Sequence, residues 1–179
     1  MSDVTSVTSL WSSFTDKAEL VGAAVMRTGS QDSASSLLRV AAGDLRCTAR
    51  VAERFPRAAR SFSTRPSKQR AVAKAGEPAA EVVAVAEFAV AETGSVVLQE
   101  PDADRGACFL AERLWVLVAE RDIVASLEHG MHRMRDLVLA GARHPLFMTG
   151  PSRTADIERV LTIGVHGPRA LVIVIVGDT

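Results

Sequence analysis

Aromatic side chains are scarce in this sequence. They make up 4% of the 179 residues, and tyrosine is absent. Residues 45–76 hold nine Arg or Lys and one acid, and such a segment can meet nucleic acid or an acidic partner. Phe55 and Phe62 are its only aromatic residues, so no series of stacking rings accompanies the arginines. We therefore predict no nucleic-acid partner, and we interpret the segment as a solvated surface that offsets the acidic residues 77–128.

Cysteine is nearly absent as well. Cys47 and Cys108 lie far apart and without a CxxC spacing, so they cannot by themselves hold an iron–sulfur cluster or a structural zinc ion. We interpret them as small buried hydrophobic residues. We predict no cofactor, and we expect the purified protein to carry neither a cluster nor a tightly bound transition metal.

Long apolar runs are missing too. No stretch approaches the roughly 20 apolar residues that a membrane-spanning helix needs. The first ten residues lack the basic start and apolar core of a signal peptide. These two absences predict a cytoplasmic protein without a membrane segment.

The remaining composition is that of a globular protein, with 47% hydrophobic and 23% charged residues. We expect a disordered N-terminus over residues 1–9 and one domain over residues 10–179. The pattern predicts an α/β fold with a mostly parallel sheet, flanking helices and an antiparallel element near 88–98. Apolar residues at helical spacing predict helices over 11–21, 32–42, 122–140 and 154–161. Short aliphatic runs predict strands at 82–85, 95–98, 114–118, 145–149 and 170–176.

The predicted helix over 122–140 begins with Asp122 as its N-cap and ends at Gly141. Its spacing predicts an inward face of Ile123, Leu127, Met131, Met134 and Val138. His129 and His132 are three residues apart on the same helix, a spacing that can hold a metal ion. No third ligand is evident, so we predict no metal site.

Two runs rich in Gly and Pro, residues 150–154 and 164–168, flank the predicted helix at 154–161. The predicted strand at 145–149, this helix and the predicted strand at 170–176 form a predicted βαβ unit, in which the two runs are the loops. Its first loop follows the carboxyl end of a strand, where open α/β sheets bind ligands. Ser152 or Thr154 can cap the helix, and Arg153 can hold a carboxylate or phosphate. Acidic residues in the first helical turn would repel an anion, so an anion site and a purely structural turn both remain open.

Two further polar residues stand in tight turns. His166, between Gly164 and Gly167, can act as a general acid or base, or can be a turn histidine bonded to backbone. In the run Glu92, Thr93, Gly94, Ser95, the carboxylate can serve as a nucleophile, a base or a ligand for a substrate hydroxyl. Equally, Glu92 can accept hydrogen bonds from turn N–H groups while Gly94 supplies a positive φ.

The stretches AETGSVVL (91–98) and TGPSRTADIERVLTIGVHGPRALVIVIV (149–176) together resemble the paired signatures of the lactate-utilisation (LUD) domain family. The resemblance implies the fold shared by ribose-phosphate isomerases, glucosamine-phosphate deaminases and CoA transferases. It also implies a role in L-lactate oxidation beside partner subunits, some of which carry iron–sulfur clusters. Since this chain lacks cluster ligands, electron transfer would belong to those partners.

Two functions follow. We favour a non-redox subunit or accessory protein of L-lactate or related organic-acid utilisation that binds a small anionic ligand or partner subunits. The alternative is a stand-alone enzyme acting on an acyl, CoA or phosphorylated substrate. In both cases we expect the turns to converge on one site, because a parallel sheet gathers its post-strand loops at one edge. Glu92 and His166 are the candidate catalytic residues, and the candidate ligand-binding residues are Thr93, Gly94, Ser95, Gly150, Ser152, Arg153, Thr154, Gly164 and Gly167.

Overall fold

The structure is a computed structural model that describes residues 9–41, 45–60, 81–155, 161–163 and 167–177. At its centre, β10 (Ala170–Val176) runs parallel to β1 (Ala24–Thr28) on one side and to β5 (Arg113–Ala119) on the other. The aliphatic side chains of β10 alternate between two cores. Leu171, Ile173 and Ile175 enter one core, while Val172, Val174 and Val176 enter the core on the opposite face. A strand buried on both faces is what an uninterrupted aliphatic run predicts.

The sheet continues from β5 to β3 (Glu81–Val90), β4 (Ser95–Leu98) and β7 (Leu146–Met148), in the order β1-β10-β5-β3-β4-β7. Two short strands, β2 (Leu45–Cys47) and β6 (Ile123–Val124), also pair with β3. The β3 and β4 strands are antiparallel, which confirms the antiparallel element predicted near 88–98. The predicted strands at the five aliphatic runs are all present.

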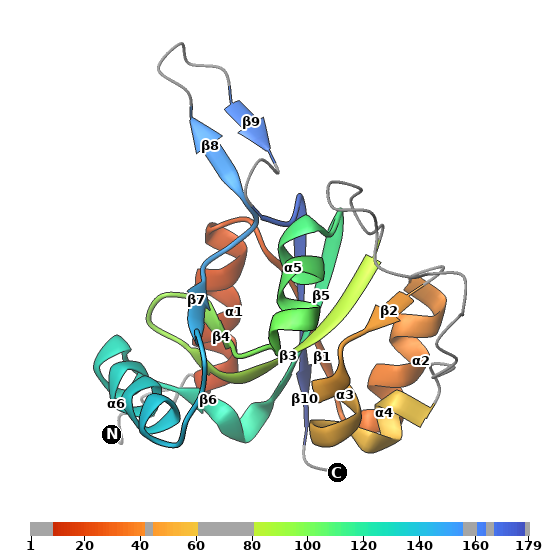
Figure 1. Ribbon diagram of the computed structural model, residues 1–179, viewed down its shortest axis with the longest axis horizontal. Coiled ribbons are helices and arrows are strands. Elements are labelled where there is room, and N and C mark those ends of the chain that lie inside the picture. Colours follow the sequence, from red (N-terminus) through yellow and green to blue (C-terminus); the bar gives the residue numbers. More distant parts are fainter. Residues whose placement is uncertain (1–8, 42–44, 61–80, 156–160, 164–166, 178–179) are drawn as a thin grey trace, which may run out of the picture.

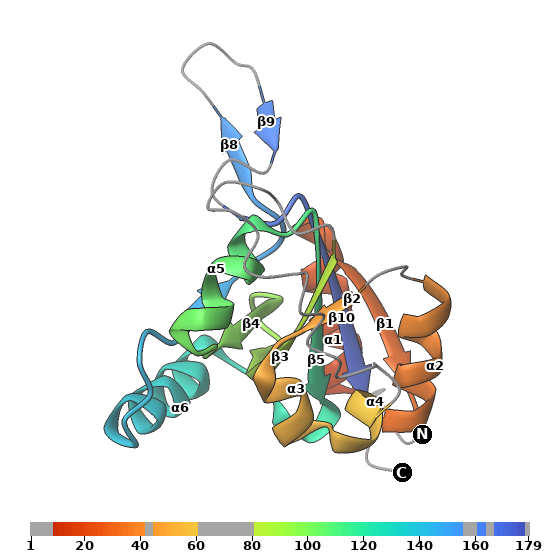
Figure 2. The ribbon, with the colours of Figure 1, turned by 45° about the vertical axis from the view of Figure 1, so that its right-hand side comes forward.

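Helices cover both faces of the sheet (Figures 1 and 2). One face is covered by α2 (Gln31–Ala41), α3 (Ala49–Arg54) and α4 (Pro56–Arg60), which bury Leu38, Val51 and Phe55 against it. The other face is covered by α1 (Leu10–Leu20) and α5 (Asp102–Leu110), through Phe14, Ala18 and Cys108. The predicted α/β class with flanking helices is therefore confirmed. None of the helices in the described ranges combines the length and hydrophobicity that a membrane span requires.

The β3 strand changes partners at a bulge. Its first half pairs with β5 and its second half pairs with β4, and the register shifts between Ala86 and Phe88. The residue at this irregularity is Glu87, which is only 5% exposed. A bulge re-aims side chains, and here the irregular position holds the one charged residue of an otherwise apolar stretch, 82–91.

The predicted helix over 154–161 is wrong. Residues on either side of 156–160 form two short antiparallel strands, β8 (Arg153–Ala155) and β9 (Leu161–Ile163), and 156–160 lie outside the described residues. In Figures 1 and 2 these strands project from the body of the molecule. Ile157, Val160 and Leu161 have helical spacing, but so short a window cannot distinguish helix from strand, and β-branched residues favour strands. The predicted βαβ unit is also wrong, since β7 and β10 are not neighbours.

The start of the long helix also differs from the prediction. Asp122 belongs to a 3-10 turn, Glu120–Asp122, and α6 (Leu127–Leu139) begins after Ser126, whose Oγ accepts a hydrogen bond from the His129 N–H. The helix is rotated relative to the predicted inward face. Leu127, Met131 and Val138 are exposed, whereas Gly130 is buried and Met134 and Leu137 pack against Phe88, Val90 and Val97. Gly130 permits this approach, because a Cβ there would come within 2.8 Å of a Val90 methyl group.

Candidate functional site

Three segments that the sequence singles out lie in contact. We call residues 92–95, 149–152 and 167–168 the turn cluster. Because β4 and β7 are antiparallel neighbours with Val96 opposite Met148, the adjacent Ser95 and Thr149 also meet, and their hydroxyl groups share a 2.7 Å hydrogen bond. The Ser152 N–H donates to the Pro168 carbonyl at 2.9 Å, which joins the third segment to the second.

Two glycines seat the turn cluster on the end of α1. Gly94 and Gly150 have φ angles of +67° and +77°, a region that favours glycine. A Cβ at Gly94 would overlap the backbone at Ala18, and a Cβ at Gly150 would overlap the Val21 carbonyl. The positive φ proposed for Gly94 is therefore present, and both positions need glycine for a second, steric reason.

The carboxylate of Glu92 is engaged with α6. Its Oε2 accepts a 2.7 Å hydrogen bond from the Leu127 N–H, and the Glu92 N–H donates to the Ala125 carbonyl at 3.1 Å. An acceptor at this place satisfies a free N–H group at a helix start and complements the helix dipole. The Glu92 carboxylate therefore accepts a hydrogen bond from a backbone N–H group, as the structural alternative predicted. That N–H group belongs to the start of α6, however, and not to the turn of Glu92 itself.

The hydroxyl groups of the turn cluster form a chain. Thr93 Oγ1 lies 2.7 Å from Ser95 Oγ, which in turn lies 2.7 Å from Thr149 Oγ1. Ser95 is 3% exposed, whereas Thr149 is exposed. Each hydroxyl group can donate and accept, so the chain links a buried oxygen atom to the surface at Thr149.

The remaining predicted site residues fall into two groups. Gly167 packs against Ser152, where a Cβ on Gly167 would lie 3.1 Å from the Ser152 Cβ. Arg153 and Thr154 have their backbone in β8. Gly164 and His166 lie outside the described residues. The roles of Arg153 as a clamp and of Glu92 and His166 in catalysis remain predictions.

One location differs from expectation. Residues 167–168 directly precede β10, so this part of the turn cluster lies at the amino end of a central parallel strand. The expected place was the carboxyl edge of a parallel sheet.

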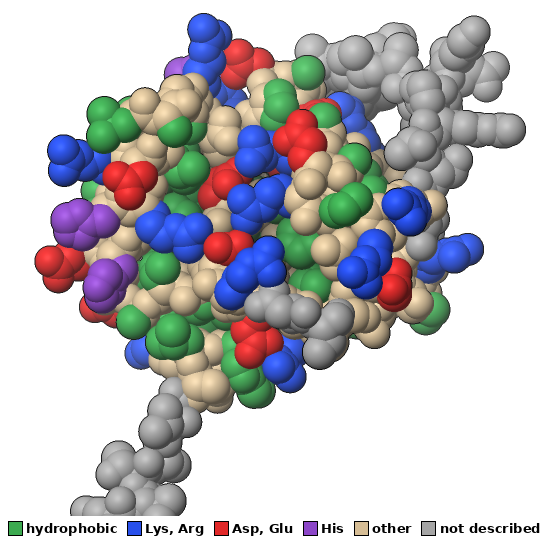
Figure 3. Space-filling model, turned by 90° about the horizontal axis from the view of Figure 1, so that it is seen from below, with side chains coloured by type: hydrophobic (Ala, Val, Ile, Leu, Met, Phe, Trp, Pro, Cys, Tyr) green, Lys and Arg blue, Asp and Glu red, His purple; other side chains and the backbone are tan. Residues whose placement is uncertain are grey.

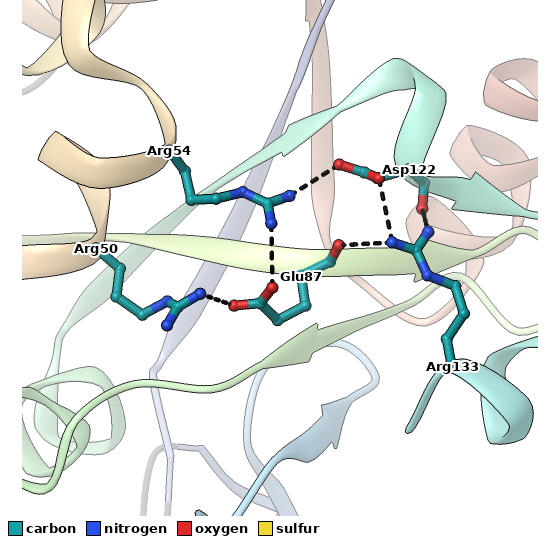
Figure 4. A network of polar contacts seen from close by, with 5 residues as sticks. All are labelled: Arg50, Arg54, Glu87, Asp122 and Arg133. Carbon is teal, nitrogen blue, oxygen red and sulfur yellow. Dashed lines mark hydrogen bonds and ion pairs between the residues drawn. The ribbon is translucent and has the colours of Figure 1, made fainter. Parts of the chain in front are cut away.

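A second polar group was not predicted from the sequence. Figure 4 shows this arginine network, which consists of Arg50 and Arg54 on α3, Glu87 on β3, Asp122 after β5, and Arg133 on α6. Arg50 pairs with Glu87, and Arg54 donates to both acids, at 3.2 Å to Glu87 and 2.9 Å to Asp122. Three guanidinium groups face two carboxylates, so the network carries one surplus positive charge.

Arg133 closes the arginine network from the opposite side. It donates to Asp122 Oδ1 at 3.2 Å and lies 5.0 Å from the centre of the Phe88 ring. The interpretation of residues 45–76 as a solvated surface is wrong for Arg50 and Arg54, whose side chains are 20% and 32% exposed. The informative sequence features were the four-residue spacing of these arginines and the single acid inside an aliphatic run.

The two cysteines, on β2 and α5, and the acid Glu100 are wholly or partly buried. Burial raises the pKa of the Cys47 thiol to about 11 and that of the Cys108 thiol to about 12. Cys108 is buried in a hydrophobic core, as predicted, whereas Cys47 is only partly buried and packs against another core. Glu100 is 5% exposed, and burial raises its pKa although Thr48 and the Val85 N–H donate to Oε1.

Potential metal ligands are dispersed over the described parts of the chain, where no three His, Cys, Asp or Glu side chains gather into a metal-binding group. His129 and His132 are both exposed on α6. His129 Nδ1 shares a 2.9 Å hydrogen bond with the Ser126 hydroxyl group.

Comparisons with known proteins agree with the motif resemblance. The family model described as the LUD domain matches residues 53–176 of this chain. The chain is 33% identical over 108 residues to lactate utilization protein C of Geobacillus thermodenitrificans and 32% identical over 109 residues to that of Bacillus subtilis. These matches cover 58% and 59% of this chain but 45% of each relative, so the chain matches less than half the length of these curated relatives.

A solved structure shares the fold. A DUF162 family protein from Deinococcus radiodurans superimposes with a TM-score of 0.69 and 22% identity, over 94% of this chain and 96% of the other. The LUD domain match extends over more than two thirds of the 179 residues and includes both motif stretches. The chain therefore belongs to the LUD domain family.

Proposed function

We propose that this protein is a non-redox component of L-lactate or related organic-acid utilisation, and that the turn cluster is its contact surface for a partner subunit. The named relatives support the pathway, since they are lactate utilization proteins. With two separated cysteines in the sequence, electron transfer would belong to iron–sulfur partner subunits.

The main observation in support of a partner contact is that the turn cluster lies at the base of β8 and β9. Residue 152 of the cluster leads directly into β8 at Arg153, and the two strands project from the body of the molecule (Figure 1). Short projecting strands offer unpaired backbone groups to another chain. The cluster below them is held by hydrogen bonds and by two glycines seated on α1, which gives a partner a preorganised base.

An anion at the same place is less well supported. The sequence suggested backbone N–H groups at a helix start as its donors, but Arg153–Ala155 form a strand and that helix start does not exist. Glu92, the nearest candidate acid or base, is directed to the first turn of α6. These two features favour a protein partner over a small anion at the turn cluster.

The test uses a strain whose growth on L-lactate depends on this protein. Thr149→Arg places a long cationic side chain on the exposed end of the hydroxyl chain, and Ser36→Arg makes the same type of change at an exposed hydroxyl residue of α2. We expect Thr149→Arg to abolish growth on lactate and to lose co-purifying lactate-system proteins, with an unchanged melting temperature. Ser36→Arg should grow normally.

Normal growth and normal co-purification of Thr149→Arg would refute the partner contact. Turnover of an acyl, CoA or phosphorylated compound by the purified protein alone would instead establish the alternative, a stand-alone enzyme.

A further inference from the structure

Helix α6 carries an apolar stripe beside the face that packs on the sheet. Leu127, Met131 and Val138 are 41%, 53% and 53% exposed. At 100° per residue these three side chains fall within an arc of about 40° on the helix surface. The half-buried Met134 fills the gap between Met131 and Val138. We call Leu127, Met131 and Val138 the α6 stripe. A contiguous apolar patch on an exposed surface marks a site of interaction.

The α6 stripe is accessible to another molecule. In both ribbon views α6 lies at the margin of the protein (Figures 1 and 2). Figure 3, in which α6 lies at the left, shows hydrophobic side chains interspersed with charged and His side chains on this part of the surface. The exposure of the stripe and the marginal position of the helix leave room for a second protein chain.

The charges beside the α6 stripe indicate which chain covers it. Glu128 and Arg135 are both exposed and lie on the same flank, about 60–80° from the centre of the stripe. In the described part of the chain, the ion pair of α6 is that of Arg133 with Asp122. Glu128 and Arg135 stand about 10 Å apart along the helix axis. Side chains of one helix pair over three or four residues, so both charges are available to another molecule.

An antiparallel second copy of α6 meets both charges at once. A twofold axis midway between Glu128 and Arg135 passes close to Met131, and it brings the same flank of the two helices together. Glu128 of each copy then lies opposite Arg135 of the other, which gives two equivalent ion pairs. Leu127 of one copy lies within about 3 Å, measured along the axis, of Val138 of the other. The two Met131 side chains meet at the twofold axis. Such a self-complementary contact is the isologous interface of a twofold dimer.

We propose that α6 pairs with α6 of a second copy and joins two chains into a homodimer. This inference goes beyond the proposed function, which concerns a different protein at the turn cluster. Each copy contributes three half-exposed apolar side chains and two charges at their rim, so the contact is smaller than the roughly 1,600 Å² of a standard interface. We therefore expect a weak dimer, with a dissociation constant on the order of 10–100 µM.

The experiment is sedimentation equilibrium of the full chain over roughly 5–500 µM, a range that brackets the expected dissociation constant. We expect a reversible shift from the mass of one chain to that of two. Met131→Lys places two like charges face to face at the twofold axis and should weaken the dimer by about tenfold or more. Leu139→Lys is the matched control, because Leu139 is 73% exposed but lies about 100° from the centre of the stripe. It should change the dissociation constant by less than about twofold.

Two charge variants test the antiparallel register. Glu128→Arg and Arg135→Glu each place like charges opposite each other in a homodimer, so each variant alone should associate about fivefold more weakly or worse. An equal mixture of the two variants restores both pairs of opposite charge, so it should form a heterodimer of nearly wild-type strength. All the substituted side chains are exposed, so each variant should melt within about 2–3 °C of wild type.

Four results would overturn the proposal. The first is a chain that sediments as a monomer at every concentration; loss of co-purifying lactate-system proteins from Met131→Lys would then assign the stripe to a partner subunit. The second is a Met131→Lys variant that dimerises like wild type, which would place the contact elsewhere. The third is equal weakening by Met131→Lys and Leu139→Lys, which would show non-specific apolar association. The fourth is a mixture of the charge variants that associates no more tightly than either variant alone.

Discussion

Replacing Glu87 by glutamine tests whether the arginine network stabilises the fold. Glu87 is 5% exposed and accepts from Arg50 and Arg54 on the two oxygens of its carboxylate. Glutamine has nearly the same shape, but it is neutral, and its NH₂ group would face a guanidinium donor. The variant therefore leaves positive charge at a largely buried position without a matching acceptor.

The expected loss in the free energy of unfolding depends on the partners that Arg50 and Arg54 keep in the Glu87→Gln variant. Removing one member of a buried ion pair costs roughly 3–5 kcal/mol. Arg54 keeps Asp122 at 2.9 Å and its side chain is 32% exposed, so water and the second acid compensate part of the loss. Arg50 is less exposed, at 20%, and among the described residues Glu87 is its carboxylate partner. We therefore expect Glu87→Gln to lower the free energy of unfolding by about 3 kcal/mol, the smaller value of that range. For a chain of this size, such a loss lowers the melting temperature by about 6–12 °C.

The assay is thermal and urea unfolding of wild type, Glu87→Gln and Glu120→Gln. Glu120 pairs with Arg27 at 2.8 Å, but the two side chains are 28% and 46% exposed. Breaking this surface pair should cost less than about 1 kcal/mol. At about 1 M salt, where the Debye length is roughly 3 Å, the small effect of Glu120→Gln should vanish while that of Glu87→Gln persists.

The reasoning fails if Glu87→Gln melts within about 2 °C of wild type, since that corresponds to a loss of 1 kcal/mol or less. It also fails if Glu87→Gln and Glu120→Gln have equal effects. A double-mutant cycle with Arg50→Gln checks the partner assignment, because residues in one network should show a coupling energy of at least about 0.5 kcal/mol.

Two further predictions concern backbone fit and pH. Gly94→Ala should destabilise the protein more than Gly141→Ala. Both glycines have a positive φ, which costs each variant about 1 kcal/mol. A Cβ at Gly94 would also overlap backbone atoms, whereas a Cβ at Gly141 would meet nothing within 4 Å. Equal melting temperatures of the two variants would contradict this. Burial raises the pKa of Glu100 above that of the unfolded chain, so its contribution to stability is greatest at low pH and is lost as pH rises through the folded pKa. Glu100→Gln should therefore gain melting temperature relative to wild type from about pH 4 to pH 8, and a difference independent of pH would refute the assignment.

The parts of the fold that were predictable are those in which one local pattern had a single structural solution. The aliphatic run at 170–176 is too short for a membrane helix and too uniformly apolar for a surface, so a central strand was the solution. The start of α6 was predicted at the wrong residue, Asp122 in place of Ser126, and both residue types can cap a helix. Asp122 pairs with two arginines from α3 and α6, and no local pattern reveals that requirement.

Helix α5 was missed for a related reason. Residues 99–106 have three acids, a proline and a glycine, which is a composition typical of a loop. In the structure Pro101 precedes the first helical turn, where Asp102 and Asp104 complement the helix dipole, and Cys108 enters the core. Asp104 also pairs with Arg46 at 3.1 Å. The acids therefore mark a helix start whose partner lies 58 residues away in the sequence, beyond the range of periodicity arguments.

The same long-range pairing explains why the candidate site was only partly predictable. The turns at 92–95 and 149–152 could be identified from their residues, and the β4–β7 register brings them together. The wrong prediction of a helix over 154–161, however, led us to expect helix N–H groups as the donors of an anion site at the turn cluster. Because Arg153–Ala155 form a strand, no helix begins there, and the argument for an anion at the turn cluster no longer holds. The pairing of the described arginines of residues 45–76 was not predictable for the same reason. Arg50 and Arg54 turn inward to Glu87 and Asp122, and Arg57 remains beside the carboxyl ends of the strands. Each acid of the network is shared by two arginines, so the network is held by partners far apart in the sequence that no local pattern joins.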